Sequence, residues 1–259
     1  MTNELTAAIR SHEPMVGTWL SIGHPALAEL SASLGYDFVV VDTEHAPVGT
    51  ETVEQMLRGV DAAPGDTRAL VRVAWNDPVR IKRVLDLGVD GLIVPMVQTA
   101  EEAETAVEAV RYPPEGIRGI AATRASEYGL NFEEYVESHN EEILTIVQIE
   151  SESAVENVRE IAAVDGIDAV FVGPADLSAS LGVFGEWDGE VLAEAVAHVL
   201  DEAHAVDVPV GTLSLSDDEI RRDLDRGFDF LVAGTDAGHL VAGNRRMQAT
   251  YESALDDHE

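Results

Sequence analysis

The chain has 259 residues, of which 46% are hydrophobic and 25% are charged, which is enough apolar material for one large folded core. Its 49 acidic and 16 basic residues give a formal net charge of -33, a field that repels nucleic acid and anionic membranes and argues against both as partners. The absence of cysteine excludes disulfides, thiolate metal sites and a cysteine nucleophile.

Short apolar runs alternate with stretches of helical period along the whole chain. Ala103, Ala106, Val107 and Val110 form a stripe that is typical of an amphipathic helix, and a longer stripe runs through residues 191–203. Apolar strands separated by helices indicate a parallel sheet covered by helices. The predicted strands lie at residues 17–21, 38–42, 69–75, 91–97, 144–150, 169–173, 209–214 and 230–234.

Eight such units in about 250 residues predict an α/β fold of the TIM (β/α)8 barrel type. A doubly wound sheet is the alternative, but it usually carries a glycine-rich dinucleotide fingerprint after its first strand, and GTWLSIGHP does not match one. No internal repeat or linker stands out, so we expect residues 1–259 to form a single barrel domain. The irregular stretch at 111–129 is longer than an ordinary loop, which marks it as functional.

Polar residues follow the predicted strands at their carboxyl ends, which is where TIM barrels carry their chemistry. We expect these side chains to converge on one face of the barrel. The residues at these positions are Asp42, Glu44, His45, Arg72, Gln148, Glu150, Asp176, Thr212 and Ser214.

Glu150 and Asp176 end neighbouring strands, so their carboxylates can share one hard divalent cation. Oxygen ligands suit Mg²⁺ or Mn²⁺, and Co²⁺ is a softer alternative. Taken singly, Glu150 also fits a helix N-cap region and Asp176 a turn residue after Pro174. Their occurrence together at adjacent strand ends favours a metal site.

His45 fits either a structural histidine beside Pro47 or, next to a metal and an arginine, a general base. Arg72 lies within the apolar run ALVRVAW, where a buried guanidinium needs an anionic partner such as a substrate carboxylate or enolate. Asp86 follows the third predicted helix, and the pattern alone indicates a solvated acid at a helix end.

Cationic residues narrow the chemistry further. A Schiff-base aldolase needs a lysine within the barrel, and the only lysine, Lys82, falls on the third predicted helix, so imine chemistry is excluded. In the long irregular stretch, Arg118 and Arg124 either hold an anionic substrate or pack against a neighbouring chain.

The acidic residues also indicate the salt environment in which the protein functions. Many carboxylates with a single lysine are typical of a salt-adapted protein, whose self-repulsion is screened by molar salt. The start of the chain lacks the basic and apolar regions of a signal peptide, and no apolar run approaches the length of a membrane span. We therefore expect a halophilic, soluble and cytoplasmic protein.

Six segments together, VVVDTEHAP, ALVRV, VLDLGVDGLIVPMVQTAEEA, YPPEGIRG, IVQIES and FVGPADLSASLG, resemble the metal-dependent pyruvate aldolases of the HpcH/HpaI aldolase (citrate lyase-like) family. The resemblance runs from about residue 14 to about residue 240. It implies that His45 is the base and that Arg72 stabilises the pyruvate enolate. It also implies that Asp86 pairs with the histidine and raises its basicity, which overrides the interpretation from the pattern alone.

The same resemblance assigns the ligands. It implies that Glu150 and Asp176 bind the divalent cation, and that Gln148, Ala175 and Asp176 contact the substrate, the alanine through its backbone. The implied reaction is reversible cleavage of a 4-hydroxy-2-oxo acid to pyruvate and a small aldehyde. The implied assembly is a homo-hexamer, a trimer of dimers, in which the C-terminal helix at about 236–256 is exchanged between subunits.

Two alternatives remain open. A citrate lyase-like acyl-CoA lyase of the same superfamily would need a basic patch for phosphates, and the chain offers only small clusters at residues 80–83 and 221–222. A non-catalytic barrel serving in assembly would be expected to lose part of the set of site residues, all of which are present. The aldehyde is not fixed by the sequence, and we expect residues 111–129 and the segment FGEWDG (184–189) to select it.

Overall fold

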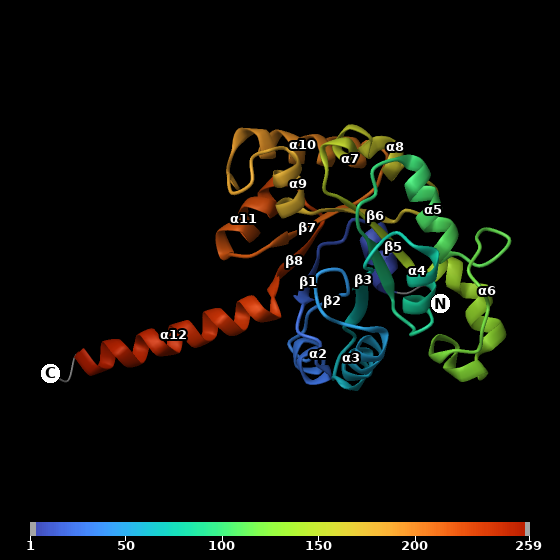
Figure 1. Ribbon diagram of the computed structural model, residues 1–259, viewed down its shortest axis with the longest axis horizontal. Helices are drawn as coiled ribbons and strands as arrows, with labels where there is room; N and C mark the ends of the chain where they lie inside the picture. The colour runs from blue at the N-terminus through green and yellow to red at the C-terminus, as the bar shows by residue number, and fades with distance from the viewer. Residues whose placement is uncertain (1–3, 257–259) are drawn as a thin grey trace.

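A closed barrel of eight parallel strands forms the centre of the protein (Figure 1). The computed structural model describes residues 4–256, in which each strand pairs with the next along the chain and β8 pairs with β1. The predicted TIM barrel is therefore confirmed, and every predicted strand overlaps an observed one. The strands are β1 (Met15–Leu20), β2 (Phe38–Asp42), β3 (Arg68–Arg72), β4 (Gly91–Val94), β5 (Leu144–Ile149), β6 (Ala169–Val172), β7 (Val210–Ser214) and β8 (Phe230–Thr235).

Strand β4 ends three residues before the predicted end of its apolar run. The next residue, Pro95, has no N–H for the ladder, and Met96 has a φ of 56°, a left-handed conformation that leaves the strand. The apolar run VPMV therefore continues the sequence pattern but not the sheet. In this conformation the Met96 N–H points toward the carboxylate of Glu150, one of the predicted site residues.

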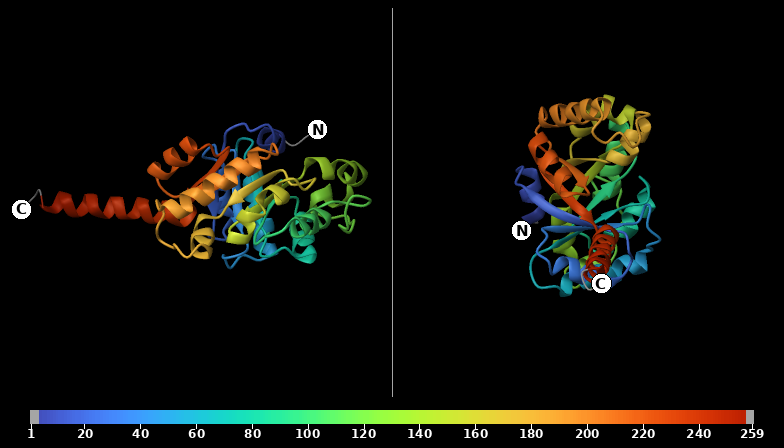
Figure 2. Two further views of the ribbon diagram at one scale, coloured as in Figure 1. Left: turned by 90° about the horizontal axis from the view of Figure 1, so that it is seen from above. Right: turned by 90° about the vertical axis from the view of Figure 1, so that its left-hand side faces the viewer.

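Helices surround the barrel on its outer side (Figures 1 and 2). Within residues 4–256, no helix combines the length and the hydropathy needed to cross a membrane. The helices are α1 (Glu4–Arg10), α2 (Pro25–Ala32), α3 (Thr50–Ala62), α4 (Pro78–Leu85), α5 (Ala100–Val110), α6 (Phe132–Glu142), α7 (Glu152–Glu156), α8 (Val158–Ala162), α9 (Pro174–Ser180), α10 (Glu190–His204), α11 (Asp217–Arg226) and α12 (Asp236–Asp256), with a 3-10 helix η1 (Arg124–Gly129).

Side-chain caps begin several of the helices that follow strands. Asp77, Thr99, Ser151 and Ser216 each accept a hydrogen bond from a backbone N–H in the first turn of the next helix. Each such bond satisfies a donor that the helix itself leaves free. The chain can therefore turn sharply at the carboxyl ends of the strands, where functional side chains collect.

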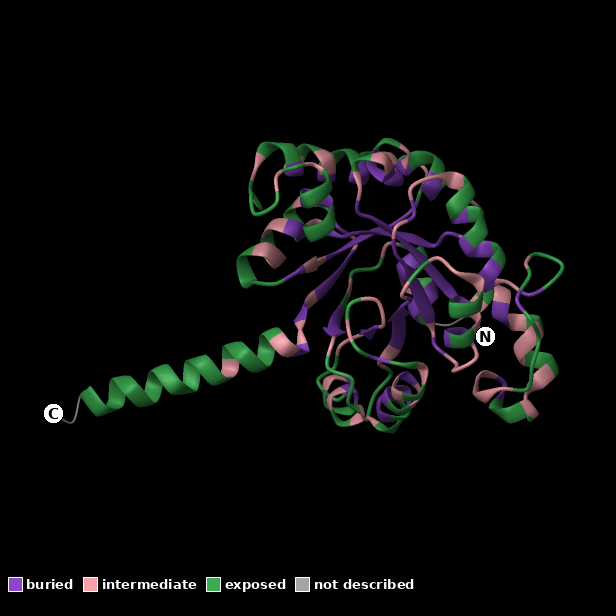
Figure 3. Cartoon of the chain, viewed as in Figure 1, coloured by how far each residue is buried: buried purple, intermediate pink, exposed green. Residues whose placement is uncertain are grey.

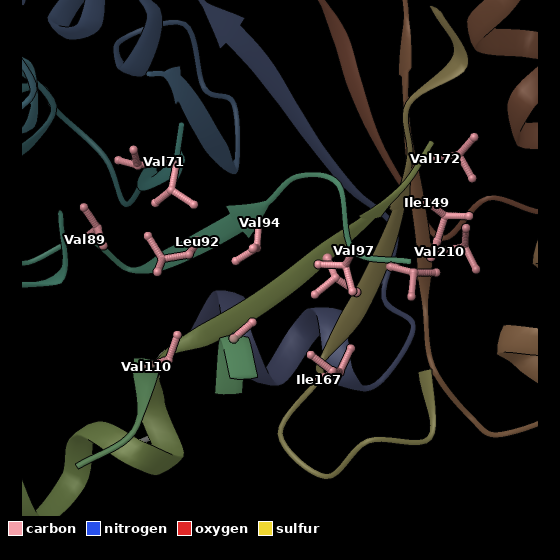
Figure 4. Packing of buried hydrophobic residues seen from close by; sticks show 14 of the residues in the cluster. Val71, Val89, Leu92, Val94, Val97, Val110, Ile149, Ile167, Val172 and Val210 are labelled. Carbon is pink, nitrogen blue, oxygen red and sulfur yellow. The ribbon is translucent and has the colours of Figure 1, made fainter. Parts of the chain in front are cut away.

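The strands separate two apolar cores, because successive side chains point to opposite faces of a strand. In β2, Val39 and Val41 join the outer core against the helices, whereas Phe38 and Val40 join the inner core. Figure 3 shows the buried strands inside helices with exposed outer faces, and Figure 4 shows part of the outer core. The inner core consists of Leu5, Ile9, Trp19, Phe38, Val40, Leu70, Ile93, Leu144, Ile146, Ala169, Phe171, Phe230 and Val232.

Helix α1 closes the N-terminal end of the barrel. Its residues Leu5 and Ile9 are 2% and 1% exposed and belong to the inner core. Arg10 donates a hydrogen bond from Nε to Asp168 Oδ1 at 2.7 Å and so holds the end of the helix against the start of β6. We call this N-terminal end the base of the barrel and the carboxyl ends of the strands its mouth.

A short repeat organises the base. A Gly-X-Asp segment precedes each even-numbered strand, and its glycine always has a positive φ, of 85°, 76°, 100° and 94° in chain order. Glycine adopts this conformation without the steric cost of a Cβ. The repeated unit is only three residues long and recurs at every second strand. The four segments are residues 35–37, 88–90, 166–168 and 227–229.

Each aspartate of this repeat accepts a hydrogen bond from a backbone N–H at the start of the preceding strand. The bond ties an even-numbered strand to its neighbour before the ladder begins. The four pairs are Asp37 with Val16 (2.8 Å), Asp90 with Ala69 (2.8 Å), Asp168 with Thr145 (2.7 Å) and Asp229 with Val210 (2.7 Å).

Helix α12 leaves the barrel and extends away from it (Figures 1 and 2). Its first residue, Asp236, is buried and accepts hydrogen bonds from the backbone N–H groups of Ser21 (3.0 Å) and Ile22 (2.9 Å), which fixes the point of departure. The predicted helix at 236–256 is confirmed, and its exchange between subunits stays a prediction. The exposed apolar side chains along it are Leu240, Val241, Met247, Tyr251 and Leu255.

Candidate active site

Arg72, the last residue of β3, places a fixed positive charge at the mouth. It stands in register with Asp42, the last residue of β2, and donates two hydrogen bonds to the Asp42 carboxylate, from Nε at 2.9 Å and Nη2 at 2.8 Å. Its Nη1 lies 2.9 Å from Glu44 Oε2, and its guanidinium carbon lies 4.7 Å from the centroid of the Trp19 ring. The anionic partner that a buried arginine needs therefore comes from two carboxylates of the protein.

The two carboxylates differ in how easily they ionise. Burial alone would raise the pKa of Asp42, but the hydrogen bonds and charge of Arg72 outweigh it, so the pKa lies below its usual value. For Glu44, burial is the larger effect and raises the pKa in spite of Arg72. Asp42 therefore holds the guanidinium rigidly, while Glu44 is the weaker of the two acids.

Glu150, directly after β5, is 4% exposed. Its Oε1 accepts a hydrogen bond from the Met96 N–H at 2.7 Å, and its Oε2 accepts one from Gln148 Nε2 at 2.9 Å. Burial raises the pKa of Glu150 from 4.5 to about 7; the Met96 hydrogen bond opposes this shift, and the charges of Glu44 and Asp176 add to it. The side chains of the protein thus leave negative charge in excess here, which favours binding of a cation.

Gly173, the residue before α9, makes room for Glu150. A Cβ at this position would lie 3.0 Å from Glu150 Oε2 and 3.2 Å from Gln148 Nε2, so a larger residue would displace both side chains. Gln148 Oε1 is buried and accepts no hydrogen bond from the described residues. Since a buried acceptor is normally paired, this oxygen is available to a ligand.

Helix α9 presents Ala175 and Asp176 in its first turn, both exposed. The charge of Asp176 raises the pKa of Glu44 and of Glu150, so the three carboxylates are close enough to interact. Oxygen donors of this kind are the ligands that Mg²⁺ and Mn²⁺ prefer. The residues present therefore fit a divalent cation between Glu150 and Asp176.

His45 lies at the rim of the mouth, with 67% of its side chain exposed. Its Nε2 is 3.8 Å from Glu44 Oε2, and it borders the same cavity as Arg72 and Asp176. A purely structural histidine beside Pro47 would be expected to be packed and hydrogen-bonded. His45 is instead largely exposed and borders the cavity, where a ligand can reach it.

Asp86 lies at the opposite end of the barrel from His45. Helix α4 runs back from the mouth after β3, so Asp86, which caps its C-terminus, lies beside the start of β4. Its carboxylate accepts a hydrogen bond from Arg118 Nη2 at 3.1 Å. Among the ion pairs of residues 4–256, none joins Asp86 to His45, so the pairing that the resemblance implies is not made within one chain.

The irregular segment 111–129 also packs away from the mouth. Arg118 is completely buried and lies 2.7 Å from His139 Nε2, whose pKa falls to about 3 through burial and the nearby guanidinium charge. Arg124 pairs with Asp61. No described residue of this segment borders the mouth cavity. Neither arginine can therefore hold a substrate in the cavity of its own chain.

A cavity of about 490 Å³ opens at the mouth. Its polar part contains the predicted residues His45, Arg72, Gln148, Ala175 and Asp176, which the fold brings together from four strand ends. This volume lies within the range of small-molecule sites in proteins.

The other part of the cavity lies between β7, α10 and α11, where Leu192, Val196 and Leu215 form an apolar wall. Charged residues of α11 also border it, namely Glu219, Arg222, Asp223 and Arg226. Trp187 of the segment FGEWDG also borders it and packs against Phe184, with ring centroids 5.3 Å apart. Of the two segments expected to select the aldehyde, only 184–189 reaches the cavity of its own chain.

The last two predicted site residues, Thr212 and Ser214, lie in different surroundings. Thr212 borders the cavity, whereas Ser214 donates a hydrogen bond to Asp223 Oδ2 at 2.9 Å and so supports α11. Sequence reasoning missed Trp19, which lies against Arg72, and Met96, whose backbone binds Glu150. An aromatic residue near the end of the first strand was a visible signal for Trp19, but nothing in the sequence marks the left-handed backbone of Met96.

Comparison with known proteins gives the family of this chain. Residues 15–242 match the family model described as HpcH/HpaI aldolase/citrate lyase. A 4-hydroxy-2-oxovalerate aldolase of Novosphingobium aromaticivorans is 43% identical over 241 residues, which cover 93% of this chain and 91% of that protein. A hydroxypyruvate/pyruvate aldolase of Sagittula stellata is 42% identical over 236 residues, which cover 91% of this chain and 92% of that protein.

A solved structure shows the same fold. The crystal structure of a HpcH/HpaI aldolase/citrate lyase family protein from Burkholderia cenocepacia superimposes with a TM-score of 0.94 at 35% identity, over 97% of this chain and 100% of that one. The fold and the relatives together define a barrel enzyme of the carbon–carbon lyase class. The chain belongs to the HpcH/HpaI aldolase/citrate lyase family.

Proposed function

We propose that this chain is a class II pyruvate aldolase that reversibly cleaves a 4-hydroxy-2-oxo acid to pyruvate and a small aldehyde. The observation that carries the proposal is the group of carboxylates around Arg72 at the mouth, where burial and neighbouring charge raise the pKa of Glu150 to about 7. The only lysine, Lys82, lies on α4 and does not border the cavity, which supports chemistry without an imine.

Glu150 and Asp176 would hold the divalent cation, and Mg²⁺, Mn²⁺ and Co²⁺ are the candidates. Such an ion polarises a keto group and stabilises the negative charge of an enolate. Gly173 keeps the space beside Glu150 open, and Gln148 and the Met96 N–H fix the orientation of its carboxylate. These contacts would hold the Glu150 carboxylate in a fixed orientation before an ion or a substrate binds.

Arg72 would stabilise the enolate of the pyruvate fragment. Its two hydrogen bonds to Asp42 hold the guanidinium in place, so little reorganisation is needed as charge develops. The free Oε1 of Gln148 and the backbone of Ala175 in the first turn of α9 would contact the substrate. Gln148 and Ala175 would therefore bind the substrate, whereas Arg72 would stabilise the charge that develops in the transition state.

His45 would act as the general base that takes the proton from the C4 hydroxyl of the substrate. The C3–C4 bond then breaks, its electron pair moves into the pyruvate enolate, and the aldehyde leaves. In the reverse direction His45 returns the proton to the new hydroxyl. Because Asp86 lies at the base of its own chain, a pairing with His45 requires Asp86 of another copy, which links this role to the predicted assembly.

The assembly that we propose is a homo-hexamer, a trimer of dimers, in which α12 packs against another subunit. The support is the helix itself, which extends from the barrel with Leu240, Met247 and Tyr251 57%, 64% and 66% exposed (Figure 3). Apolar side chains in such numbers on an isolated helix favour burial against a partner.

Acyl-CoA chemistry is less well supported. In one of the two basic clusters, Arg221 pairs with Asp218, and Arg222 with Asp188 and Asp223, and no residue of the cluster at 80–83 borders the mouth cavity. A purely structural role in assembly would not need the carboxylates of the mouth. Both alternatives predict no aldol activity.

An aldehyde panel tests the proposal. The protein is incubated with pyruvate and glyceraldehyde, lactaldehyde, succinic semialdehyde, tartronate semialdehyde or glycolaldehyde in molar KCl, with EDTA or with each divalent ion. We expect condensation that EDTA abolishes and an added ion restores. The absence of condensation under every condition, or full activity in EDTA, would contradict the proposal. Circular dichroism at falling KCl concentration tests the expected salt adaptation in the same preparation.

A further inference from the structure

Two histidines and an aspartate meet at the base of the barrel, at the opposite end from the mouth. His12 follows α1, His204 is the last residue of α10, and Asp229 immediately precedes β8. His12 Nδ1 lies 2.8 Å from Asp229 Oδ1, and His204 Nε2 lies 2.8 Å from Asp229 Oδ2. Ligand atoms of the three residues lie within 4.8 Å of one another, and nothing in the proposed aldolase reaction uses them.

The repeat at the base shows what is unusual about this group. Asp168 and Asp90 occupy the equivalent position before β6 and β4, and each faces a guanidinium, that of Arg10 at 2.7 Å and that of Arg68 at 3.5 Å. Asp229 faces two imidazoles instead. A guanidinium always carries its charge, whereas a neutral imidazole offers a nitrogen lone pair that binds a transition metal ion.

A fourth group completes the set. His12 Nε2 is buried and has no hydrogen-bond partner among the described residues, and it lies 3.5 Å from Asp207 Oδ1. A cation bound between these two groups would give His12 Nε2 a partner. His12 and Asp207 both have left-handed backbones, with φ of 56° and 63°, in the conformation that brings them together.

Ions can reach this place from solvent. A polar cavity of about 380 Å³ lies beside it, and Asp207, Asp168 and Arg10 border that cavity. The side chain of Asp207 is 99% exposed and that of His204 is 36% exposed, so both can adjust to an ion. The net charge of -33 raises the concentration of cations around the whole protein.

We propose that His12, His204 and Asp229, with Asp207 as the fourth ligand, bind one Zn²⁺ or a similar borderline divalent cation. Two imidazoles with carboxylates form a donor set for Zn²⁺, Ni²⁺ or Co²⁺, whereas Mg²⁺ prefers oxygen ligands alone. Zn²⁺ holds such ligands at about 2.0–2.2 Å, so the three side chains, whose ligand atoms lie within 4.8 Å of one another, would move closer together to share one ion. This site is separate from the pair Glu150 and Asp176 in position and in ligand chemistry.

The consequence is structural, because the ion would join three distant parts of the chain. His12 follows the helix that closes the barrel, His204 ends α10, and Asp229 begins the strand that completes the barrel. A cation bound only by the folded protein stabilises it in proportion to its affinity. Residues at the base of a TIM barrel commonly serve stability, which is consistent with such a role.

Metal retention in two variants tests the site. The full chain carrying Glu150→Gln, which removes a ligand at the mouth, is stripped with chelator and titrated with Zn²⁺ in molar KCl against a chromophoric competitor. We expect one bound equivalent, a higher melting temperature with Zn²⁺, and visible absorption of tetrahedral Co²⁺ when cobalt replaces zinc. Adding His204→Asn should weaken Zn²⁺ binding at least about tenfold, the loss seen even for residues that only support metal ligands.

His198→Asn is the matched control, because His198 is an exposed histidine on the same helix. It should leave Zn²⁺ affinity and the melting shift unchanged, and His204→Asn alone should leave aldol activity with Mg²⁺ unchanged. Asp207→Asn, at an exposed residue where misfolding is not expected, should also weaken Zn²⁺ binding. Failure to retain Zn²⁺, or equal affinity in the His204 and His198 variants, would overturn the site and leave only a hydrogen-bonded network.

Discussion

The two ends of this barrel use carboxylates in opposite ways. At the base, each aspartate of the repeat accepts a backbone N–H, and Asp168 also faces Arg10. At the mouth, Glu44, Glu150 and Asp176 gather near one guanidinium, and burial together with their mutual charge keeps the pKa of Glu150 at about 7. At the base, Arg68 and Arg10 face Asp90 and Asp168, although burial still raises the pKa of Asp168, whereas at the mouth several carboxylates share one guanidinium and leave negative charge for a ligand to neutralise.

This difference explains why one residue type can serve both stability and chemistry in the same fold. A carboxylate that accepts a strand N–H stabilises the start of a sheet, and where an arginine also pairs with it, as at Asp168, a protein group balances its charge. A carboxylate that raises the pKa of its neighbours costs stability and persists where function requires it. The comparison therefore predicts that substitutions at the mouth change activity and that substitutions at the base change stability.

The largest effect is expected for Glu150→Gln. The substitution removes a metal ligand but preserves the shape of the side chain, whose amide oxygen can still accept the Met96 N–H. We expect kcat/KM for aldol cleavage to fall at least about a thousandfold, because electrostatic stabilisation of the enolate is lost. Pyruvate release measured with and without added divalent ion gives the readout, and Glu152→Gln, at an exposed position in α7, is the control. Activity that still responds to EDTA at the parental level would contradict the assignment of Glu150.

His45→Ala should have the next largest effect. Removal of a general base costs about a hundredfold to ten-thousandfold in rate. Because 67% of the side chain is exposed, the melting temperature should not change. Near-normal turnover in steady-state cleavage assays would contradict its role as the base, and His24→Ala at the start of α2 controls for loss of an exposed histidine near the mouth.

The stability of the protein without metal should depend on Glu150 and on pH. Its pKa is about 7 in the folded chain and 4.5 as a free side chain, so ionisation destabilises the folded state. The penalty is absent below pH 4.5, grows as pH rises through the interval, and reaches up to about 3 kcal/mol above pH 7. Urea unfolding in EDTA should therefore show Glu150→Gln to be more stable than the parent above pH 7 and equal to it below pH 4.5. Equal stability at both pH values would show that the mouth carries no such excess charge.

Asp168→Ala tests the opposite end. It leaves the Thr145 N–H without its acceptor and Arg10 without its partner, and both are at least partly buried. We expect a loss of about 2 kcal/mol in the free energy of unfolding, with kcat/KM unchanged. Asp165→Ala, whose side chain is 96% exposed, should change neither quantity. A variant that kept its stability but lost activity would remove the distinction between the two ends.

The barrel could be predicted from the sequence because each strand and helix produces a pattern of apolar residues within its own short segment. Eight apolar runs and the stripes between them report burial directly, and runs such as residues 38–42 coincide with an observed strand. The residues at the mouth were also accessible, since their positions follow from where strands end. Resemblance alone supplied the role of Asp86, and the path of α4 shows that one chain cannot supply the pairing.

What the sequence could not predict depends on backbone conformation and on distant segments. The left-handed backbone of Met96 follows no composition rule, yet it supplies the N–H that holds Glu150. The Gly-X-Asp repeat is too short to stand out until the hydrogen bonds of its aspartates are seen. The meeting of His12 with Asp229 joins residues separated by 217 positions, which no local pattern reports.

The smallest effect that we predict concerns Trp187, which borders the apolar part of the mouth cavity and is 42% exposed. Trp187→Ala removes an apolar surface that an aldehyde substituent could contact, but it leaves the carboxylates and Arg72 in place. The ratio of kcat/KM for succinic semialdehyde to that for glycolaldehyde should change about two- to tenfold, because each buried CH₂ of apolar contact is worth about 0.8 kcal/mol. The apparent affinity for the divalent ion should stay the same, because no metal ligand is touched. Leu130→Ala, at a residue 89% exposed that does not border the cavity, should leave the ratio unchanged. An unchanged ratio for Trp187→Ala would assign aldehyde selection to other residues, whereas a change in metal affinity would mean that the polar and apolar parts of the mouth act as one unit.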